Sequence, residues 1–145
     1  MRDTIQAELL MSFLVSDELS FRIPVELRYE AADPYAVRFT FHLPGDAPVT
    51  WAFARELLLD GLSTPSGDGD VHIRPISQRP PSDVFIRLQV GAECAAFRAG
   101  AAPLVAFLNR TDRVVPLGKE EWYADSDGSL DAALDRILAT ERNAG

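Results

Sequence analysis

The sequence predicts an α+β fold: antiparallel, strongly twisted sheets of about seven strands, a short helix in mid-chain and two helices at the C-terminal end. Two observations lead to this prediction. Apolar residues alternate with a period of two through the first two-thirds of the chain, and in the last third they recur every three or four residues. Strands first and helices afterwards favour an antiparallel sheet over alternating βαβ units. The 145 residues suit a single domain covering 1–145.

Two long strands open the predicted sheet. Apolar residues alternate from Ile5 to Val15 and again from Leu19 to Tyr29, and residues 16–18 can close a hairpin between the two runs. Pro24 has no N–H to donate to a neighbouring strand. The second strand is therefore expected at an edge of the sheet, or with a bulge at Pro24.

Shorter strands and one helix follow. Alternating apolar residues predict strands near residues 37–43, 49–53, 71–75, 84–90 and 95–99. Between them, Ala54–Asp60 consists mostly of good helix formers, and Gly61 can close this helix in the left-handed conformation. The segment from Ser63 to Asp70 is almost entirely turn formers and is expected to be a loop.

Two helices are predicted in the last third of the chain. An apolar stripe runs from Leu104 to Thr111 at helical spacing, with Pro103 in the first turn and the end of the helix before Pro116. The same spacing recurs from Leu130 to Leu138, where Ser129 is a suitable N-cap.

Charge and composition argue against several functional classes. The chain carries 14 basic and 22 acidic residues, a formal charge of −8, which disfavours general attraction to nucleic acid phosphates or anionic lipid. No apolar run approaches the ~20 residues of a membrane-spanning helix, and the start of the chain does not resemble a secretory signal. Cys94 is the single cysteine, so no intrachain disulfide can form. A cytoplasmic protein without direct membrane insertion is expected.

No pattern of residues indicates catalysis, a metal or a cofactor. His42 and His72 occur singly on the polar side of predicted strands, without metal-ligand spacing to Cys94. Cys94 lies among small residues and is expected to be a buried, inert thiol. Residues 125–136 superficially resemble a calcium loop, but the required glycine is replaced by Leu130. Neither a catalytic, nor a cofactor, nor a metal site is expected.

Arginines in the predicted strands are the one feature that favours nucleic acid. Six of them stand beside apolar residues, most on the outward side: Arg22, Arg28, Arg38, Arg74, Arg87 and Arg98. Binding of single strands would also require exposed aromatic residues for base stacking, for which Phe85 is a candidate. A solvated or protein-binding face explains the same arginines, so nucleic acid binding remains the alternative hypothesis.

Four segments resemble a known family in order and spacing. They are LRYEAADPYAVRFTFH at 27–42, WAFARELLLDGL at 51–62, GDGDVHIRP at 67–75 and FLNRTDRVVPLGKE at 107–120. Together they resemble the signature of the SsgA-like sporulation-specific cell-division proteins of spore-forming actinobacteria, over nearly the whole chain.

The resemblance implies a non-enzymatic regulator of septum formation with a fold related to the whirly-type nucleic-acid-binding proteins. It implies a homotrimer that acts as an adaptor at the division septum. Its expected partners are the tubulin-like division protein FtsZ, wall-remodelling proteins or another SsgA-like protein. The family-signature positions are Tyr29, Asp33, Pro34, Tyr35, Trp51, Phe53 and Arg55.

Several signature positions also have a structural interpretation. Asp33-Pro34 favours a turn, and Trp51 and Phe53 share the apolar side of a strand. Arg55, at the start of a helix, could pair across a subunit boundary or face a partner.

The connection from Val115 to Asp127 is the best candidate contact surface outside the signature. It places Leu117, Trp122 and Tyr123 among charged residues, a pattern typical of interfaces. A buried aromatic pair that caps the core explains these residues equally well.

Overall fold

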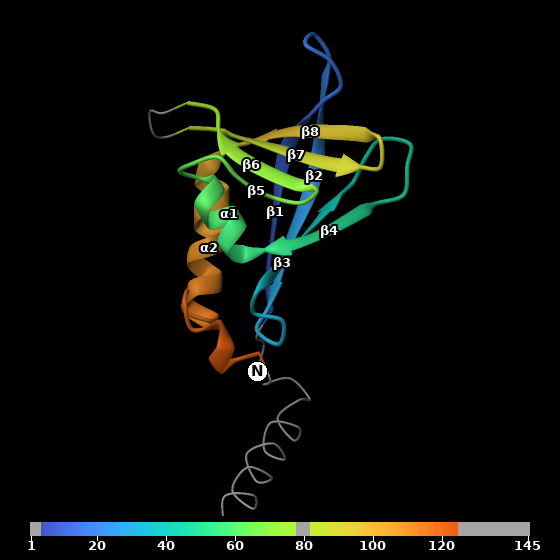
Figure 1. Cartoon of the computed structure of the whole chain (residues 1–145). Coiled ribbons are helices and arrows are strands. Elements are labelled where there is room, and N and C mark those ends of the chain that lie inside the picture. Colours follow the sequence, from blue (N-terminus) through green and yellow to red (C-terminus); the bar gives the residue numbers. More distant parts are fainter. Residues whose placement is uncertain (1–3, 78–81, 125–145) are drawn as a thin grey trace, which may run out of the picture.

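The computed structural model describes residues 4–77 and 82–124 (Figure 1). Within them, eight strands form one sheet: β1 (Thr4–Leu14), β2 (Ser20–Glu30), β3 (Ala36–Phe41), β4 (Val49–Ala54), β5 (Ser66–Asp68), β6 (Val71–Pro75), β7 (Val84–Val90) and β8 (Glu93–Ala99). The strand order is β4-β3-β2-β1-β8-β7-β6-β5, and every neighbouring pair is antiparallel. The predicted α+β class with an antiparallel sheet is confirmed.

The sheet curls on itself, so that its two halves enclose the core. Phe41 in β3 and Phe97 in β8 stack with ring centroids 4.4 Å apart, although β2 and β1 lie between these strands in the sheet order. Phe13 of β1 also stacks against Phe97, with ring centroids 5.2 Å apart. The alternation read in the sequence is what places these rings on one face, because successive side chains of a strand point to opposite faces.

Two helices complete the core. They are α1 (Arg55–Gly61) and α2 (Ala101–Val114), and Figure 1 shows them beside each other on one side of the sheet. Leu58 of α1 and Leu104 and Phe107 of α2 are almost completely buried. A short 3₁₀ turn, η1 (Glu120–Trp122), follows α2. Both helices were predicted; the last predicted helix, residues 129–138, lies outside the described residues.

The prediction that Ser63–Asp70 is a loop is wrong for residues 66–68, which form β5. With β5, the described strands number eight and not about seven. Ser66, Gly67 and Asp68 pair with Ile73, His72 and Val71 of β6. A three-residue strand is too short to show an alternating apolar pattern. The neighbouring turn, with Gly69 at φ +63°, accounts for the turn-forming residues that predict a loop. The sequence therefore predicts the turn correctly but not the short strand before it.

The expected edge position or bulge at Pro24 is also wrong, since β2 lies between β1 and β3. Pro24 faces Leu10 of β1 in an uninterrupted register. Its carbonyl accepts a hydrogen bond from the N–H of His42 at 3.1 Å, just beyond the last β2–β3 pair, Val25 and Phe41. The missing N–H therefore falls where the β2–β3 pairing ends, and the pairing with β1 continues past Pro24 without interruption.

Gly61 does not close α1 in the left-handed conformation, which corrects the sequence prediction. It is the last residue of the helix and is not among the described glycines with positive φ. The reason for glycine is space: a Cβ at this position would lie 2.5 Å from Cγ2 of Ile73 and 3.0 Å from its carbonyl oxygen. A side chain at residue 61 would push α1 away from β6.

Among the described residues, no helix combines the length and apolar character that crossing a membrane requires.

Candidate functional site

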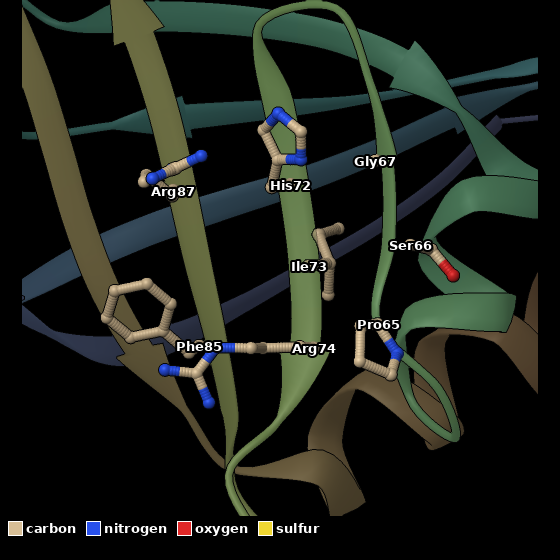
Figure 2. Close-up of a pocket in the computed structure, with 8 residues that line it drawn as sticks. All are labelled: Pro65, Ser66, Gly67, His72, Ile73, Arg74, Phe85 and Arg87. Atoms are coloured by element: carbon tan, nitrogen blue, oxygen red, sulfur yellow. The ribbon is translucent and has the colours of Figure 1, made fainter.

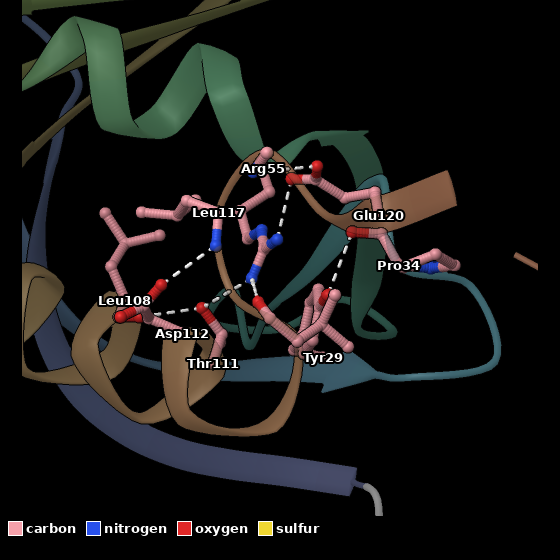
Figure 3. Close-up of polar contacts among 10 residues, drawn as sticks. Tyr29, Pro34, Arg55, Leu108, Thr111, Asp112, Leu117 and Glu120 are labelled. Atoms are coloured by element: carbon pink, nitrogen blue, oxygen red, sulfur yellow. Dashed lines mark hydrogen bonds and ion pairs between the residues drawn. The ribbon is translucent and has the colours of Figure 1, made fainter. Parts of the chain in front are cut away.

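The side chain of Arg55 is completely buried at the start of α1 (Figure 3). Its Nη1 donates to the carbonyl of Val115 at 2.7 Å and to the hydroxyl of Thr111 at 3.3 Å, and its Nη2 donates to the Glu120 carboxylate at 2.6 Å. A buried charge is costly unless it is paired and hydrogen-bonded. Arg55 therefore ties the segment that follows α2 to the start of α1.

The ring of Tyr29 packs against the guanidinium group of Arg55 and belongs to the same buried cluster as Thr111, Val115 and Glu120. The guanidinium carbon of Arg55 lies 4.8 Å from the centroid of its ring, and its hydroxyl donates to the carbonyl of Pro34 at 2.9 Å. Burial raises the pKa of Tyr29 to about 12, although the positive charge of Arg55 acts in the opposite direction. The phenol is therefore a neutral donor that holds the turn after β2 in place.

Glu120 is the anionic partner in the cluster. Burial alone would raise the pKa of its carboxyl group, but the hydrogen bond from Arg55, further hydrogen bonds and the charge of Arg55 outweigh burial and hold the pKa below its usual value. One of those bonds comes from the N–H of Gly118 at 3.0 Å. The ionised carboxylate thus links the turn at Gly118 to Arg55 at the start of α1.

Trp122 stands at the end of η1 and is 75% exposed. The Nζ of Lys119 lies 5.8 Å from the centroid of its ring, and Leu117 is 37% exposed on the same connection. Tyr123 is partly buried and packs against the core. The buried aromatic pair considered from the sequence is therefore wrong for Trp122. We call Leu117, Trp122 and Tyr123 the Trp122 surface.

The structure brings four of the seven signature positions together around Arg55. Tyr29 and Pro34 are joined by a hydrogen bond, and the carbonyl of Tyr35 accepts from the backbone N–H of Arg55 at 2.7 Å. The expectation that Arg55 pairs across a subunit boundary or faces a partner is wrong, because its described contacts lie inside the chain and it has no exposed surface. The side chain of Tyr35, by contrast, is 54% exposed.

The other signature positions are structural. Asp33 forms an ion pair with Arg38 at 2.8 Å, and its N–H closes the turn after β2 on the carbonyl of Glu30. Phe53 is buried against Phe39 with ring centroids 4.9 Å apart, and Trp51 is partly buried against the core. The Asp33-Pro34 turn and the apolar role of the aromatic pair agree with the sequence interpretation.

Cys94 is exposed, contrary to the expected buried thiol. It lies near the start of β8 opposite Gln89, close to the turn at Gly91, where the β7–β8 hairpin extends past the core. Small neighbours therefore indicated the end of a hairpin, not a packed interior. His72 is exposed, while His42 is half-buried and contacts Glu26 at 3.1 Å. Within the described residues, no group of three or more metal-binding side chains comes together.

The arginine-bearing strands contain two kinds of arginine. Arg28, Arg38 and Arg98 form ion pairs with Glu30, Asp33 and Asp83, each at 2.8 Å. Arg22 and Arg87 have no ion pair or hydrogen bond to a described residue, and Arg74 contacts the ring of Phe85. Half of the positive face is therefore neutralised within the chain.

The raised pKa of Tyr29 predicts a loss of stability at alkaline pH. The folded state holds the phenolic proton more tightly than the unfolded chain, so this stabilisation is complete below pH 10 and disappears as the pH rises from 10 to about 12. Two pKa units correspond to on the order of 2–3 kcal/mol. Urea unfolding of the native chain and of Tyr29→Phe should show a steeper alkaline decline for the native chain. Parallel declines would contradict this assignment.

Comparison with known proteins places this arrangement in a family. The family model described as Streptomyces sporulation and cell division protein, SsgA, matches residues 23–120, which include Arg55 and its partner Glu120. The chain belongs to the SsgA family. That description names cell division and sporulation and no catalytic activity.

Relatives of the chain carry consistent names. The sporulation-specific cell division protein SsgB of Streptomyces coelicolor is 42% identical over 139 residues, which cover 96% of this chain and 98% of that protein. The SsgB protein of Thermobifida fusca is 39% identical over 127 residues, covering 88% and 92%. These matches support a role in sporulation-specific cell division.

Solved structures in the same family have the same fold. One was reported with SsgB mutations that correlate to longitudinal cell division during sporulation of Streptomyces coelicolor; it matches with a TM-score of 0.77 and 42% identity over 83% of this chain and 94% of that one. The crystal structure of an SsgA-like sporulation-specific cell division protein from Thermobifida fusca matches with a TM-score of 0.80 and 38% identity, covering 90% and 95%.

Proposed function

We propose that this SsgA-family chain is a non-enzymatic adaptor of septum formation and that the Trp122 surface binds a division protein. The observation that carries the proposal is a largely exposed tryptophan on a turn that a buried ion pair anchors. Leaving a large aromatic ring in water gains nothing for folding, whereas aromatic anchors dominate the energetics of protein interfaces. The partners that fit are FtsZ, a wall-remodelling protein or another SsgA-like protein at the septum.

The Arg55–Glu120 pair supports this proposal by limiting the motion of the turn. The Glu120 carboxylate is bonded to Arg55 on one side and to the N–H of Gly118 on the other, and the N–H of Trp122 donates to the carbonyl of Lys119 at 3.0 Å. A contact residue whose backbone is already ordered loses less entropy on binding. We infer that the buried cluster serves to present Trp122.

Self-association as a homotrimer is part of the proposal. The β1–β2 hairpin carries exposed apolar side chains at Val15, Leu19 and Phe21. Residues 20–23 of β2 pair with β1 alone, because the β2–β3 pairing begins at Val25 and the last bond on that side joins Pro24 to His42. An apolar tip beside an unpaired strand edge suits a second copy of the chain. Several copies of one weak site then raise the avidity for a partner without strengthening any single contact.

The test is a crosslinking pull-down with the tagged chain from cells entering sporulation, with and without nuclease treatment. We expect division proteins in the crosslinked fraction, unchanged by nuclease, together with the chain itself. Recovery of wall enzymes without division proteins would show that the adaptor acts on wall synthesis and not on the division machinery. If nuclease treatment abolishes the recovery of partners, the alternative function is favoured, which is single-stranded nucleic acid binding through the arginine-bearing face.

A further inference from the structure

A basic groove lies on the exposed face of β5, β6 and β7 (Figure 2). The side chains of His72 and Arg74 on β6 and of Phe85 and Arg87 on β7 line it, beside Gly67 of β5. Its volume is about 480 Å³, enough for a few side chains of a bound peptide.

The register of the strands explains why these side chains gather. Antiparallel pairing sets Arg74 opposite Phe85 and His72 opposite Arg87, all on one face of the sheet. The flanking positions are small: Gly67 faces His72 on one side, and Ala96 faces Arg87 on the other. A Cβ on Gly67 would collide with the imidazole of His72, so glycine is needed here for the histidine to lie over β5.

The positive charges of this groove are not neutralised within the described chain. The guanidinium carbon of Arg74 lies 4.6 Å from the centroid of the Phe85 ring, and Arg87 has no ion pair or hydrogen bond to a described residue. Asp83, which directly precedes β7, is already bonded to Arg98 at 2.8 Å. Two guanidinium groups thus face the groove with their donors available, in a chain whose formal charge is −8.

We propose that this groove binds a short acidic peptide segment of a partner protein, whose carboxylates accept hydrogen bonds from Arg74 and Arg87. Paired guanidinium donors match carboxylate geometry, which is why arginine is favoured over lysine at such sites. A longer polyanion fits less well, because three of the six strand arginines are already paired and the acidic chain repels it. Arg74 also covers the face of Phe85 on which a base would stack. This proposal rests on the proposed function only in assuming that the partner is a protein, since the groove and the Trp122 surface have no residue in common.

The test measures fluorescence anisotropy of a labelled, capped peptide, Gly-Ser-Glu-Glu-Glu-Ser-Gly, added to the full chain at low salt. We expect it to bind at least ~10-fold tighter than the same peptide with glutamine in place of glutamate, because charge-assisted hydrogen bonds are roughly twice as strong as neutral ones. Arg87→Glu and Arg74→Glu should each weaken binding by ~10-fold or more. Arg113→Glu, an exposed site in the last turn of α2, makes the same change of net charge and should not.

Two further probes separate the outcomes. A labelled oligothymidylate that binds more tightly than the peptide, and loses binding in Arg87→Glu, would overturn the proposal in favour of nucleic acid. Equal binding of the glutamate and glutamine peptides, or no binding of either, would overturn it outright. Trp122→Ala should leave peptide binding unchanged, so failure of this groove and failure of the Trp122 surface are distinguishable.

Discussion

Arg55→Ala should lower the free energy of unfolding by ~3–5 kcal/mol, because it leaves a carboxylate and a carbonyl without their partner. The Glu120 side chain keeps only 14% exposure, and the Val115 carbonyl belongs to a fully buried residue. Urea denaturation followed by circular dichroism measures the change, and an unaltered slope would show that the folded state still buries the same surface.

Arg38→Ala is the matched control for Arg55→Ala. Arg38 also pairs with a carboxylate at 2.8 Å, but its side chain is 35% exposed, so we expect a loss within ~1 kcal/mol. Similar losses in the two variants would contradict a structural role for the buried cluster. If Arg55→Ala does not fold, Glu120→Gln still tests the cluster, with an expected loss of ~1–3 kcal/mol because it exchanges an ionic acceptor for a neutral one.

Trp122→Ala should weaken binding of the septal partner by ~2 kcal/mol or more, about 30-fold, while leaving the fold intact. A side chain that is 75% exposed contributes little to packing, so we expect the free energy of unfolding to change by less than ~0.5 kcal/mol. The measurements are recovery of the division protein in the crosslinking pull-down and the septal fraction of a fluorescently tagged chain.

The control for Trp122→Ala is Val105→Ala, which removes an exposed apolar side chain from α2 at 42% exposure. Light scattering should give the same oligomeric state for both variants. Normal septal localisation of Trp122→Ala would rule out the Trp122 surface as the contact. Glu120→Gln tests whether the buried cluster supports the Trp122 surface. Glu120 lies outside that surface, but its substitution weakens the bond to Arg55 that orders the turn, so recovery of the partner should fall.

Several differences between the predicted and the observed structure share a physical cause. The predictions for Pro24 and Gly61 follow backbone rules that hold for isolated strands and helices, but packing against neighbouring strands decides both positions. Pro24 is tolerated because β3 ends beside it, and Gly61 is required because Ile73 approaches it. The exposed Cys94 is a similar case, because a run of small residues has the same composition at a hairpin end as in a core.

The Arg55 cluster could be predicted only in part. The sequence marks Arg55 as a signature position but does not identify Val115 and Glu120 as its partners. Thr111 was the available signal: it is a polar residue on the apolar stripe of α2, and in the structure its buried hydroxyl accepts from Arg55 and donates to the carbonyl of Leu108 at 2.7 Å. A polar position on a buried stripe calls for a partner, but spacing along the chain does not identify it.

By itself, the sequence determined the class of fold, the order of its elements and the family, because alternation, helical spacing and four ordered segments are local properties of the chain. Only the tertiary structure decided that Arg55 points inward, that Trp122 points outward and that unpaired arginines share a groove. Those facts depend on which strands become neighbours when the sheet curls. Arg55 and Glu120 are separated by 65 positions and meet only because the segment after α2 returns to the start of α1.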